Sequence, residues 1–233
     1  MEAPRSDAGS MVWYDHHAER YAEVAEQFIQ SKWSSPSDLA IQGEMAVLRH
    51  LIELVGPSAK GLDAGCGPGA RDTSIFQQSG YDMTGVDITQ EGLRVAVKNH
   101  PELIGRLLRS DLSKSLPFRN GSFDFVYCNS VIQHLNIGIV HTVLLPELVR
   151  VLKEGGILQL LFKRGDGVIR LKDPQYETHR SFGLFQEHSL IDVLAERDCT
   201  MIKKPNGSDA IVYGVDNRNI HICAFWVRKS VNL

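Results

Sequence analysis

The feature that most constrains the fold is a repeated alternation of apolar runs and helical patterns between residues 61 and 163. Short runs rich in strand-forming residues occur at 61–65, 81–87, 106–112, 123–130 and 156–163. Segments with helical spacing lie between most of them, at 70–80, 89–99 and about 142–153. Strands that alternate with helices form a mostly parallel sheet through right-handed crossovers. The sequence therefore predicts an α/β fold with helices on both faces of the sheet.

The two ends of the chain depart from this alternation. Helical spacing predicts a helix over 18–30, and the SSPSD segment at 34–38 ends it and can cap a second helix that runs to about residue 55. After a helix predicted over 187–198, strands at 200–205 and 221–229 follow each other without a helix, which is typical of an antiparallel hairpin at a sheet edge. The sheet would then have about seven strands. The segment 165–186 is expected to be irregular chain over their carboxyl ends.

Composition favours one globular domain. The chain has 233 residues, of which 43% are hydrophobic and 23% charged, enough to bury one sizeable core. Its formal net charge of −3 gives no bulk attraction to nucleic acid or to an anionic membrane. The four cysteines are widely spaced, which favours reduced thiols over disulfides or a metal site. No segment resembles a signal peptide or a membrane span, so we expect a cytoplasmic protein.

A glycine-rich segment, GLDAGCGPGA at 61–70, begins with the first predicted strand and continues beyond it. Gly65, Gly67 and Gly69 permit a tight turn and a close approach of a ligand to the backbone. The helix expected from Ala70 points its free N–H groups toward the same place. The spacing differs from the G-x-G-x-x-G of dinucleotide sites, and the upstream Asp63 favours a cationic or zwitterionic ligand over a pyrophosphate. A nicotinamide-dependent oxidoreductase is therefore the less favoured interpretation.

Two further carboxylates end the neighbouring predicted strands. Asp87 ends the second strand, where a carboxylate can accept hydrogen bonds from the hydroxyls of a ribose. Asp111 ends the third strand, where it can accept from an adenine amino group. A single aspartate at such a position can equally be a turn or helix cap. Three acids at consecutive strand ends, with Asp63 as the first, favour a nucleoside site.

Read in order, these segments resemble the class I S-adenosylmethionine-dependent methyltransferases. The similarity runs through GLDAGCGPG, MTGVDITQEGL, RSDLSKSLPFRNGSFDFVYCNSVIQHL and LPELVRVLKEGGILQLLF, and it extends to the SLIDVLAERD helix and the terminal strands. It implies a single domain, residues 1–233, with a Rossmann-like fold and S-adenosylmethionine as cofactor. Within it, a helical lid would span about 12–56, a cofactor-binding core 57–163, and an acceptor-site insert with the edge hairpin 164–233. The residues that it places around the cofactor are Tyr21, Asp63, Gly65, Cys66, Gly67, Gly69, Asp87, Ile88, Asp111, Leu112 and Asn129.

The resemblance also divides the cofactor among these residues. The glycine loop would surround the methionine part, and the backbone carbonyl of Asn129 would meet the amino group. Asp87 would hold the ribose and Ile88 would pack on adenine. Asp111 and the backbone of Leu112 would read the adenine edge.

Methyl transfer requires a collinear arrangement of nucleophile, methyl and sulfur, and a base only if the acceptor is protonated. His134, in NSVIQHL after the fourth strand, and Tyr21, on the N-terminal helix, are the candidate catalytic residues. Phosphoethanolamine-type methyltransferases use a tyrosine–histidine pair of similar placement. Both residues can instead be packing groups, His134 beneath the lid and Tyr21 on an amphipathic helix.

The segment after the fifth strand, FKRGDGVIRLKDPQYETHRSFGLFQEH, mixes basic and aromatic residues. Arg180 could clamp a carboxylate or phosphate, although a solvated loop has the same composition. We expect methyl transfer to an O or N nucleophile of a small molecule that is anionic or aromatic. The candidate substrate-binding residues are Tyr14, His17, Gln133, His134, Lys163 and Arg180.

Two alternatives remain for the function. One is a methyltransferase that acts on RNA or protein, although no basic stripe with interleaved aromatics supports nucleic-acid binding. The other is a methyltransferase-like protein that binds the cofactor without turnover. The intact acids and glycines favour retained cofactor binding in either case.

Overall fold

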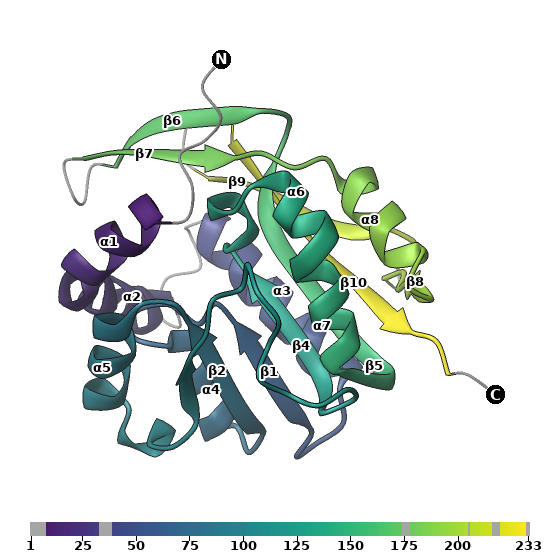
Figure 1. Cartoon of the computed structure of the whole chain (residues 1–233), viewed down its shortest axis with the longest axis horizontal. Helices are drawn as coiled ribbons and strands as arrows, with labels where there is room; N and C mark the ends of the chain where they lie inside the picture. Colours follow the sequence, from purple (N-terminus) through teal and green to yellow (C-terminus); the bar gives the residue numbers. More distant parts are fainter. Residues whose placement is uncertain (1–7, 33–38, 174–177, 205, 216–219, 232–233) are drawn as a thin grey trace.

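A central sheet organises the computed structural model, which describes residues 8–32, 39–173, 178–204, 206–215 and 220–231. Within them, neighbouring strands of an eight-stranded sheet follow the order β3-β2-β1-β4-β5-β10-β8, and β9 also pairs with β10 (Figure 1). The strands are β1 Lys60–Ala64, β2 Asp82–Asp87, β3 Leu107–Arg109, β4 Phe123–Asn129, β5 Leu152–Arg164, β8 Cys199–Met201, β9 Ala210–Val215 and β10 Ile220–Lys229. Strands β1 to β5 are parallel, and β10 is antiparallel to β5. The predicted α/β class, with a mostly parallel sheet and an antiparallel edge, is confirmed.

The carboxyl-terminal edge is more elaborate than the predicted hairpin. The strand expected at 200–205 is reduced to β8, and Pro205 lies outside the described residues. Strand β9 pairs with Ile220–Phe225, and β8 pairs with Val227–Lys229 further along the same edge of β10. The prediction of seven strands was therefore wrong by one. The sequence predicted no strand between 205 and 221, but β9 forms there because β10 gives it a partner.

Helices cover both faces of the sheet. One face packs against α7 (Leu145–Val151) and α8 (Glu187–Ala195), whose buried leucines join apolar side chains of β1, β4 and β5. The other face packs against α3 (Leu39–Leu54) and α4 (Arg71–Gln78) through the second core cluster. Helix α5 (Gln90–Asn99) packs beside β2 and β3. The helix predicted over 142–153 starts earlier, with α6 (Ile137–Ile139) and a π-helical segment η3 (Val140–Leu144), and it ends at Val151.

The segment predicted to be irregular after β5 contains a two-stranded sheet instead. Strands β6 (Val168–Asp173) and β7 (Thr178–Gly183) form an antiparallel hairpin, so this expectation was wrong. In β6, exposed Arg170 and Lys172 alternate with the less exposed Ile169 and Leu171. This period of two is a strand signal that the charged composition of the segment obscured.

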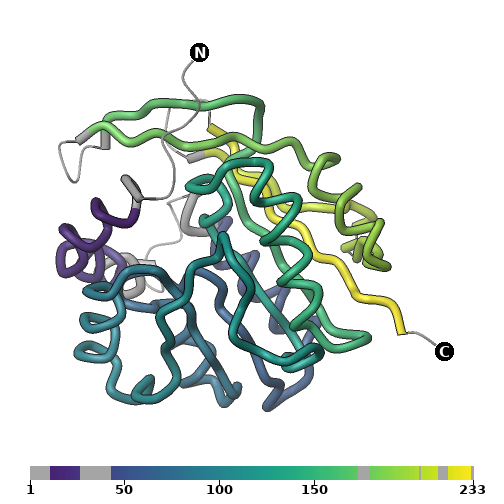
Figure 2. The backbone as a smooth tube through the Cα atoms, viewed as in Figure 1, coloured from purple at the N-terminus to yellow at the C-terminus, as the bar shows by residue number. Residues whose placement is uncertain are grey.

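The N-terminal helices α1 (Ala8–His16) and α2 (Ala18–Lys32) lie beside α5, where the backbone N–H of Glu91 donates to Asp15 Oδ1 at 3.0 Å. The β6–β7 hairpin arches above α1 (Figure 2), so the N-terminal helices and this hairpin together cover the carboxyl ends of the parallel strands. The SSPSD segment that was expected to cap α3 lies outside the described residues. Among the helices of the described segments, none has the length and apolarity needed to cross a bilayer.

Candidate functional site

The glycine turn after β1 has the backbone conformation that its sequence requires. Gly65, Gly67 and Gly69 have φ angles of +92°, +66° and +93°, which residues with a Cβ rarely adopt. The backbone N–H groups of Gly65 and Cys66 donate to the carbonyl of Val86, at 2.8 and 3.0 Å, and tie the turn to β2. A Cβ on Gly67 would meet no atom within 4 Å. The backbone at Gly67 is therefore open to a ligand.

Asp87 holds this turn in place. Its Oδ2 accepts a hydrogen bond from the backbone N–H of Gly67 at 2.9 Å. Its Oδ1 accepts from the backbone N–H and the hydroxyl of Thr89, at 2.9 and 2.7 Å. The carboxylate thus connects the end of β2, the glycine turn and the start of α5. A carboxylate has about four acceptor positions, so about one remains for a ligand.

Asp111 has the local contacts of a turn cap, the alternative that the sequence left open. Its Oδ1 accepts from the backbone N–H and the hydroxyl of Ser113, at 2.9 and 2.6 Å, and its Oδ2 lies 3.1 Å from Lys114 Nζ. Partial burial opposes ionisation, but these donors hold the pKa of Asp111 below its ordinary value. The adjacent Leu112 packs its side chain into the core.

Asp63 is buried at the end of β1 and is bonded inside the protein. It accepts from the Thr73 hydroxyl at 2.6 Å and from the Tyr127 hydroxyl at 3.1 Å. Burial, and then the nearby charges of Asp72 and Asp87, raise the pKa of Asp63 to about 8. A positive charge in the adjacent cavity would therefore favour the ionised form of this carboxyl.

A polar chain crosses the sheet and orients Asn129. Trp226 Nε1 on β10 donates to Gln159 Oε1 on β5 at 2.7 Å. Gln159 Nε2 donates to Asn129 Oδ1 at 2.8 Å, and Asn129 Nδ2 donates to Asp72 Oδ2 at 3.3 Å. The chain fixes Asn129 at the carboxyl end of β4 and links it to the start of α4.

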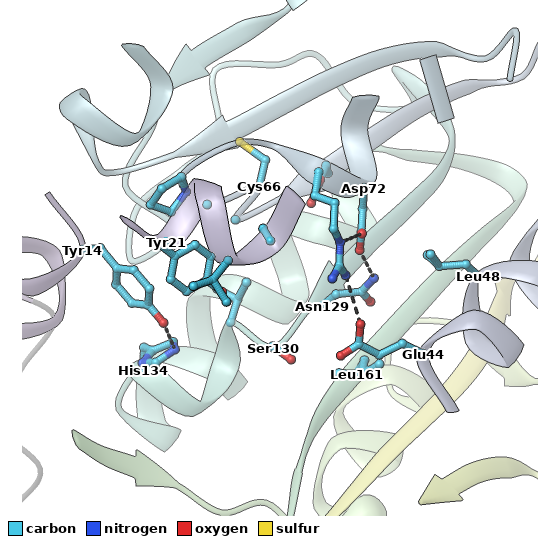
Figure 3. Close-up of a pocket in the computed structure, with 18 of the residues that line it drawn as sticks. Tyr14, Tyr21, Glu44, Leu48, Cys66, Asp72, Asn129, Ser130, His134 and Leu161 are labelled. Atoms are coloured by element: carbon cyan, nitrogen blue, oxygen red, sulfur yellow. Dashed lines mark hydrogen bonds and ion pairs between the residues drawn. The ribbon is translucent and has the colours of Figure 1, made fainter. Parts of the chain in front are cut away.

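A charged group beside the glycine turn was not among the predicted site residues. Arg71, the first residue of α4, lies with Nε 2.7 Å from Asp72 Oδ1 and with Nη2 3.2 Å from Glu44 Oε2 on α3. Figure 3 shows Glu44, Asp72 and Asn129 close together on one side of the cavity. The signal was present, since an Arg-Asp pair follows the glycine loop directly. The contribution of Glu44 depends on how α3 docks and has no local signature.

The opposite side of the cavity is formed by α1 and by chain that follows β4 and β5. The Tyr14 hydroxyl lies 3.1 Å from His134 Nε2 (Figure 3), and Arg180 Nη2 on β7 donates to the same hydroxyl. The Tyr21 ring lies 5.3 Å from the Tyr14 ring. Tyr14, which was assigned to the substrate, is thus the tyrosine that contacts His134. Burial, and then the positive charges of Arg180 and Lys163, lower the pKa of His134 to about 3.

One cavity of about 360 Å³ joins the two sides. From the predicted cofactor residues it is lined by Tyr21, Asp63, Gly65, Cys66, Gly67 and Asn129. From the predicted catalytic and substrate residues it is lined by Tyr14, His134 and Arg180. Segments separated by more than 100 residues therefore meet around one space.

The other predicted residues lie around this lining or behind it. Gly69 faces Ala22 of α2, and the carbonyl of Ile88 accepts from Arg109 Nε at 3.0 Å. His17 stacks on Trp13 with ring centroids 4.4 Å apart. The buried Gln133 accepts from the Lys163 backbone N–H at 3.3 Å, and Lys163 Nζ lies 4.8 Å from the centroid of Phe182. Asp87, Asp111 and Leu112 also lie outside the lining, with the contacts given above.

Neither a metal nor a disulfide has a site in the described ranges. Those residues contain no group of three or more histidines, cysteines or acids that could hold a metal ion. The four cysteines are free thiols, three of them buried.

Comparison with known proteins identifies the part of the chain that builds this site. Residues 62–160, from β1 into β5, match the family model described as a methyltransferase domain. The chain contains a methyltransferase domain. The match spans the glycine turn and the ends of β1, β2 and β4, and it confirms the family resemblance predicted from the sequence.

Relatives of this methyltransferase domain act on unlike acceptors. The chain is 32% identical over 149 residues to a 2-methyl-6-phytyl-1,4-hydroquinone methyltransferase of Synechocystis sp., a match that covers 63% of this chain and 44% of that protein. It is 35% identical over 136 residues to an 18S rRNA (guanine-N(7))-methyltransferase of Schizosaccharomyces pombe, covering 58% of this chain and 46% of that protein. The chain thus spans less than half the length of either relative.

A solved structure extends the likeness to nearly the whole chain. The 1,6-didemethyltoxoflavin-N1-methyltransferase of Burkholderia thailandensis superposes with a TM-score of 0.60 at 19% identity, covering 99% of this chain and 94% of that one. At this identity the likeness concerns the fold. The shared fold therefore extends beyond the matched residues 62–160.

Proposed function

We propose that this protein binds S-adenosylmethionine in the cavity and catalyses methyl transfer to an oxygen or nitrogen of a small molecule. The observation that carries the proposal is the continuity of the cavity. It connects an open glycine turn at one side to the Tyr14–His134–Arg180 group at the other. A donor and an acceptor can therefore share one enclosed space, as an in-line transfer requires.

The residues at the glycine side fit the cofactor. S-adenosylmethionine supplies a methyl group that is already activated on a sulfonium sulfur. The open backbone of Gly67 admits a close approach, and the acids Glu44, Asp63 and Asp72 complement the cationic centres of the methionine part. Arg71 offers a guanidinium for its carboxylate.

The nucleoside part has fewer open groups. Asp87 retains about one acceptor position for a ribose hydroxyl, because its other positions hold Gly67 and Thr89. The adenine is proposed to contact Ile88, Asp111 and the backbone of Leu112, which follow β2 and β3. Asp87 thus has two functions, ordering the glycine turn and binding the ribose.

The acceptor side favours catalysis by positioning. His134 is neutral at physiological pH, because burial and two nearby cations lower its pKa to about 3. A base of this strength removes few protons from an alcohol or an ammonium group. His134 and Tyr14 instead fix hydrogen bonds to the acceptor, and Tyr21 closes the space beside them. The proposal therefore favours positioning over general acid–base catalysis by Tyr21 and His134.

A small acceptor suits the covering of the cavity. Trp13 and Tyr14 of α1 contact Arg180 of β7, so the N-terminal helix and the β6–β7 hairpin meet above the cavity. A nucleotide within a folded RNA would reach His134 only after this contact opened. The rRNA methyltransferases among the relatives make RNA the second candidate acceptor.

A binding and transfer assay tests the proposal. Calorimetry with S-adenosylhomocysteine measures cofactor binding, and transfer of radiolabelled methyl from S-adenosylmethionine is followed in two parallel reactions. One contains a pool of small metabolites and the other contains total RNA. We expect binding and transfer to the small pool. Transfer to RNA alone would support the second candidate, binding without transfer would indicate a protein without turnover, and no binding would contradict the whole proposal.

A further inference from the structure

The acceptor side of the cavity contains an arginine held among aromatic rings. The Arg180 guanidinium carbon lies 4.2 Å from the centroid of Trp13, 5.0 Å from that of Tyr14 and 4.9 Å from that of Phe182. Rings that pack against a guanidinium restrict its orientation, and the Tyr14 hydroxyl also accepts a hydrogen bond from Arg180 Nη2. Arg180 is thereby positioned as a rigid donor in the cavity wall.

The strand register of the hairpin places this arginine on the cavity side. In β7, Arg180 and Phe182 are more buried than His179 and Ser181, which alternate with them and are exposed. In β6, Arg170 and Lys172 are exposed and face away from the cavity. The alternation therefore places Arg180 at the cavity and leaves Arg170 and Lys172 exposed on the other face of the hairpin.

A second cation reinforces the same side. Lys163, at the end of β5, has its Nζ 4.8 Å from the centroid of Phe182, the ring that also packs on Arg180. Both cations act on His134, where they add to burial in lowering the imidazole pKa. The positive charge of this side is thus strong enough to perturb a neighbouring group.

The far side of the cavity has the opposite character. Glu44, Asp63 and Asp72 line it, with Arg71 as the basic residue among them. Asp72 and Glu44 both lie within ion-pair distance of Arg71, at 2.7 and 3.2 Å. The cavity is therefore polarised, with acids in excess near the glycine turn and cations near Tyr14 and His134.

We propose that the methyl acceptor carries an oxyanion, a carboxylate or a phosphate, which binds to Arg180 in the positive field of Arg180 and Lys163. This inference rests on the proposed function and gives its substrate a chemical class. A cationic donor at the acidic side and an anionic acceptor at the basic side would each meet opposite charge. The oxyanion would also place the rest of the acceptor against His134 and Tyr14.

Matched pairs of small aromatic ligands test the inference. Benzoate with benzamide, and phenyl phosphate with phenol, are titrated into protein saturated with S-adenosylhomocysteine. Calorimetry gives the affinity, and NMR of the histidine side chains reports whether the His134 ring is perturbed. We expect at least one anion to bind at least tenfold more tightly than its neutral partner and to shift the His134 resonance. The two pairs distinguish a carboxylate from a phosphate.

Substitutions assign the effect to Arg180. Arg180→Gln should remove the preference for the anion, and Arg180→Lys should retain part of it, because the charge remains without the planar donor group. Arg170→Gln, on the exposed side of the same hairpin, is the matched control and should behave like the unmodified protein. The affinity for S-adenosylhomocysteine, measured for every variant, shows that each one is folded.

The outcomes separate this inference from the proposed function. Equal affinity for anion and neutral partner, including no detectable binding of either, would overturn the oxyanion inference while cofactor binding stands. A preference that survives in Arg180→Gln, or that is lost equally in Arg170→Gln, would also overturn it. Absence of S-adenosylhomocysteine binding in the unmodified protein would instead contradict the proposed function.

Discussion

Replacement of Asp87 by alanine should weaken both the fold and cofactor binding. The carboxylate accepts three hydrogen bonds, from the backbone N–H groups of Gly67 and Thr89 and from the Thr89 hydroxyl. At a net value of about 1 kcal/mol each, their loss lowers the free energy of unfolding by up to about 3 kcal/mol. For a chain of this length that corresponds to a fall in Tm of up to about 10 °C. Loss of the ribose contact and of the ordered turn should weaken S-adenosylhomocysteine binding at least tenfold, or about 1.4 kcal/mol.

The measurements are thermal unfolding and calorimetric titration with S-adenosylhomocysteine. Thr89→Val is the matched control, because it removes the hydroxyl bond and keeps the two backbone bonds to Asp87. It should cost about 1 kcal/mol of stability and leave the affinity within about threefold. If Asp87→Ala and Thr89→Val lose the same affinity, Asp87 neither orders the glycine turn nor holds the ribose, and the reasoning is refuted.

Three further predictions concern the titration, the turn and the polar chain. The pKa of His134 is about 3 in the folded protein against an ordinary 6.5, so the unfolded chain takes up a proton at higher pH than the folded protein. The free energy of unfolding should therefore fall as pH decreases from 6.5 toward 3, by at most about 1.4 kcal/mol per pH unit. Urea unfolding at each pH measures this fall, which should be shallower for His134→Gln. Gly67→Ala and Gly80→Ala both place a Cβ in open space at positive φ, so each should lower the free energy of unfolding by about 1–2 kcal/mol, measured through Tm. Only Gly67→Ala should abolish S-adenosylhomocysteine binding. Equal binding by the two variants would place the cofactor elsewhere. Gln159→Leu leaves the Trp226 indole N–H unpaired in the core and should lower the free energy of unfolding by about 2–3 kcal/mol. A loss below about 1 kcal/mol in urea titration would show that the hydrogen-bonded series from Trp226 through Gln159 to Asn129 does not stabilise the fold.

Local patterns were sufficient for the central part of the fold. The apolar runs of β1, β2, β4 and β5 and the glycine turn are short-range features, and a strand or a turn responds mainly to neighbours within a few residues. The position of Asp87 at the end of β2 followed from the same patterns. Asp63 was also located near the end of β1, whereas Asp111, predicted to end the third strand, follows the last residue of β3 by two positions. Their hydrogen-bond partners, Thr73 with Tyr127 and Ser113, were not foreseen.

The peripheral elements were harder to predict because their partners determine their structure. The segment that contains β6 was predicted to be irregular, and no strand was predicted at the position of β9. Each becomes a strand through pairing, β6 with β7 and β9 with β10. A short apolar run becomes a strand only where an unpaired sheet edge or a second strand is available. The length of β8 depends in the same way on how much of the β10 edge remains after β9 has paired with it.

The sequence by itself determined the α/β core, the open glycine turn and the set of acids at the strand ends, since each follows from residues close together along the chain. Only the tertiary structure decided what faces that turn. Tyr14 meets His134 across 120 positions and Arg180 across 166, and Glu44 reaches Arg71 from another helix. Such contacts depend on how whole elements dock against one another, because docking is governed by the shape and burial of complete surfaces and not by any single run of residues.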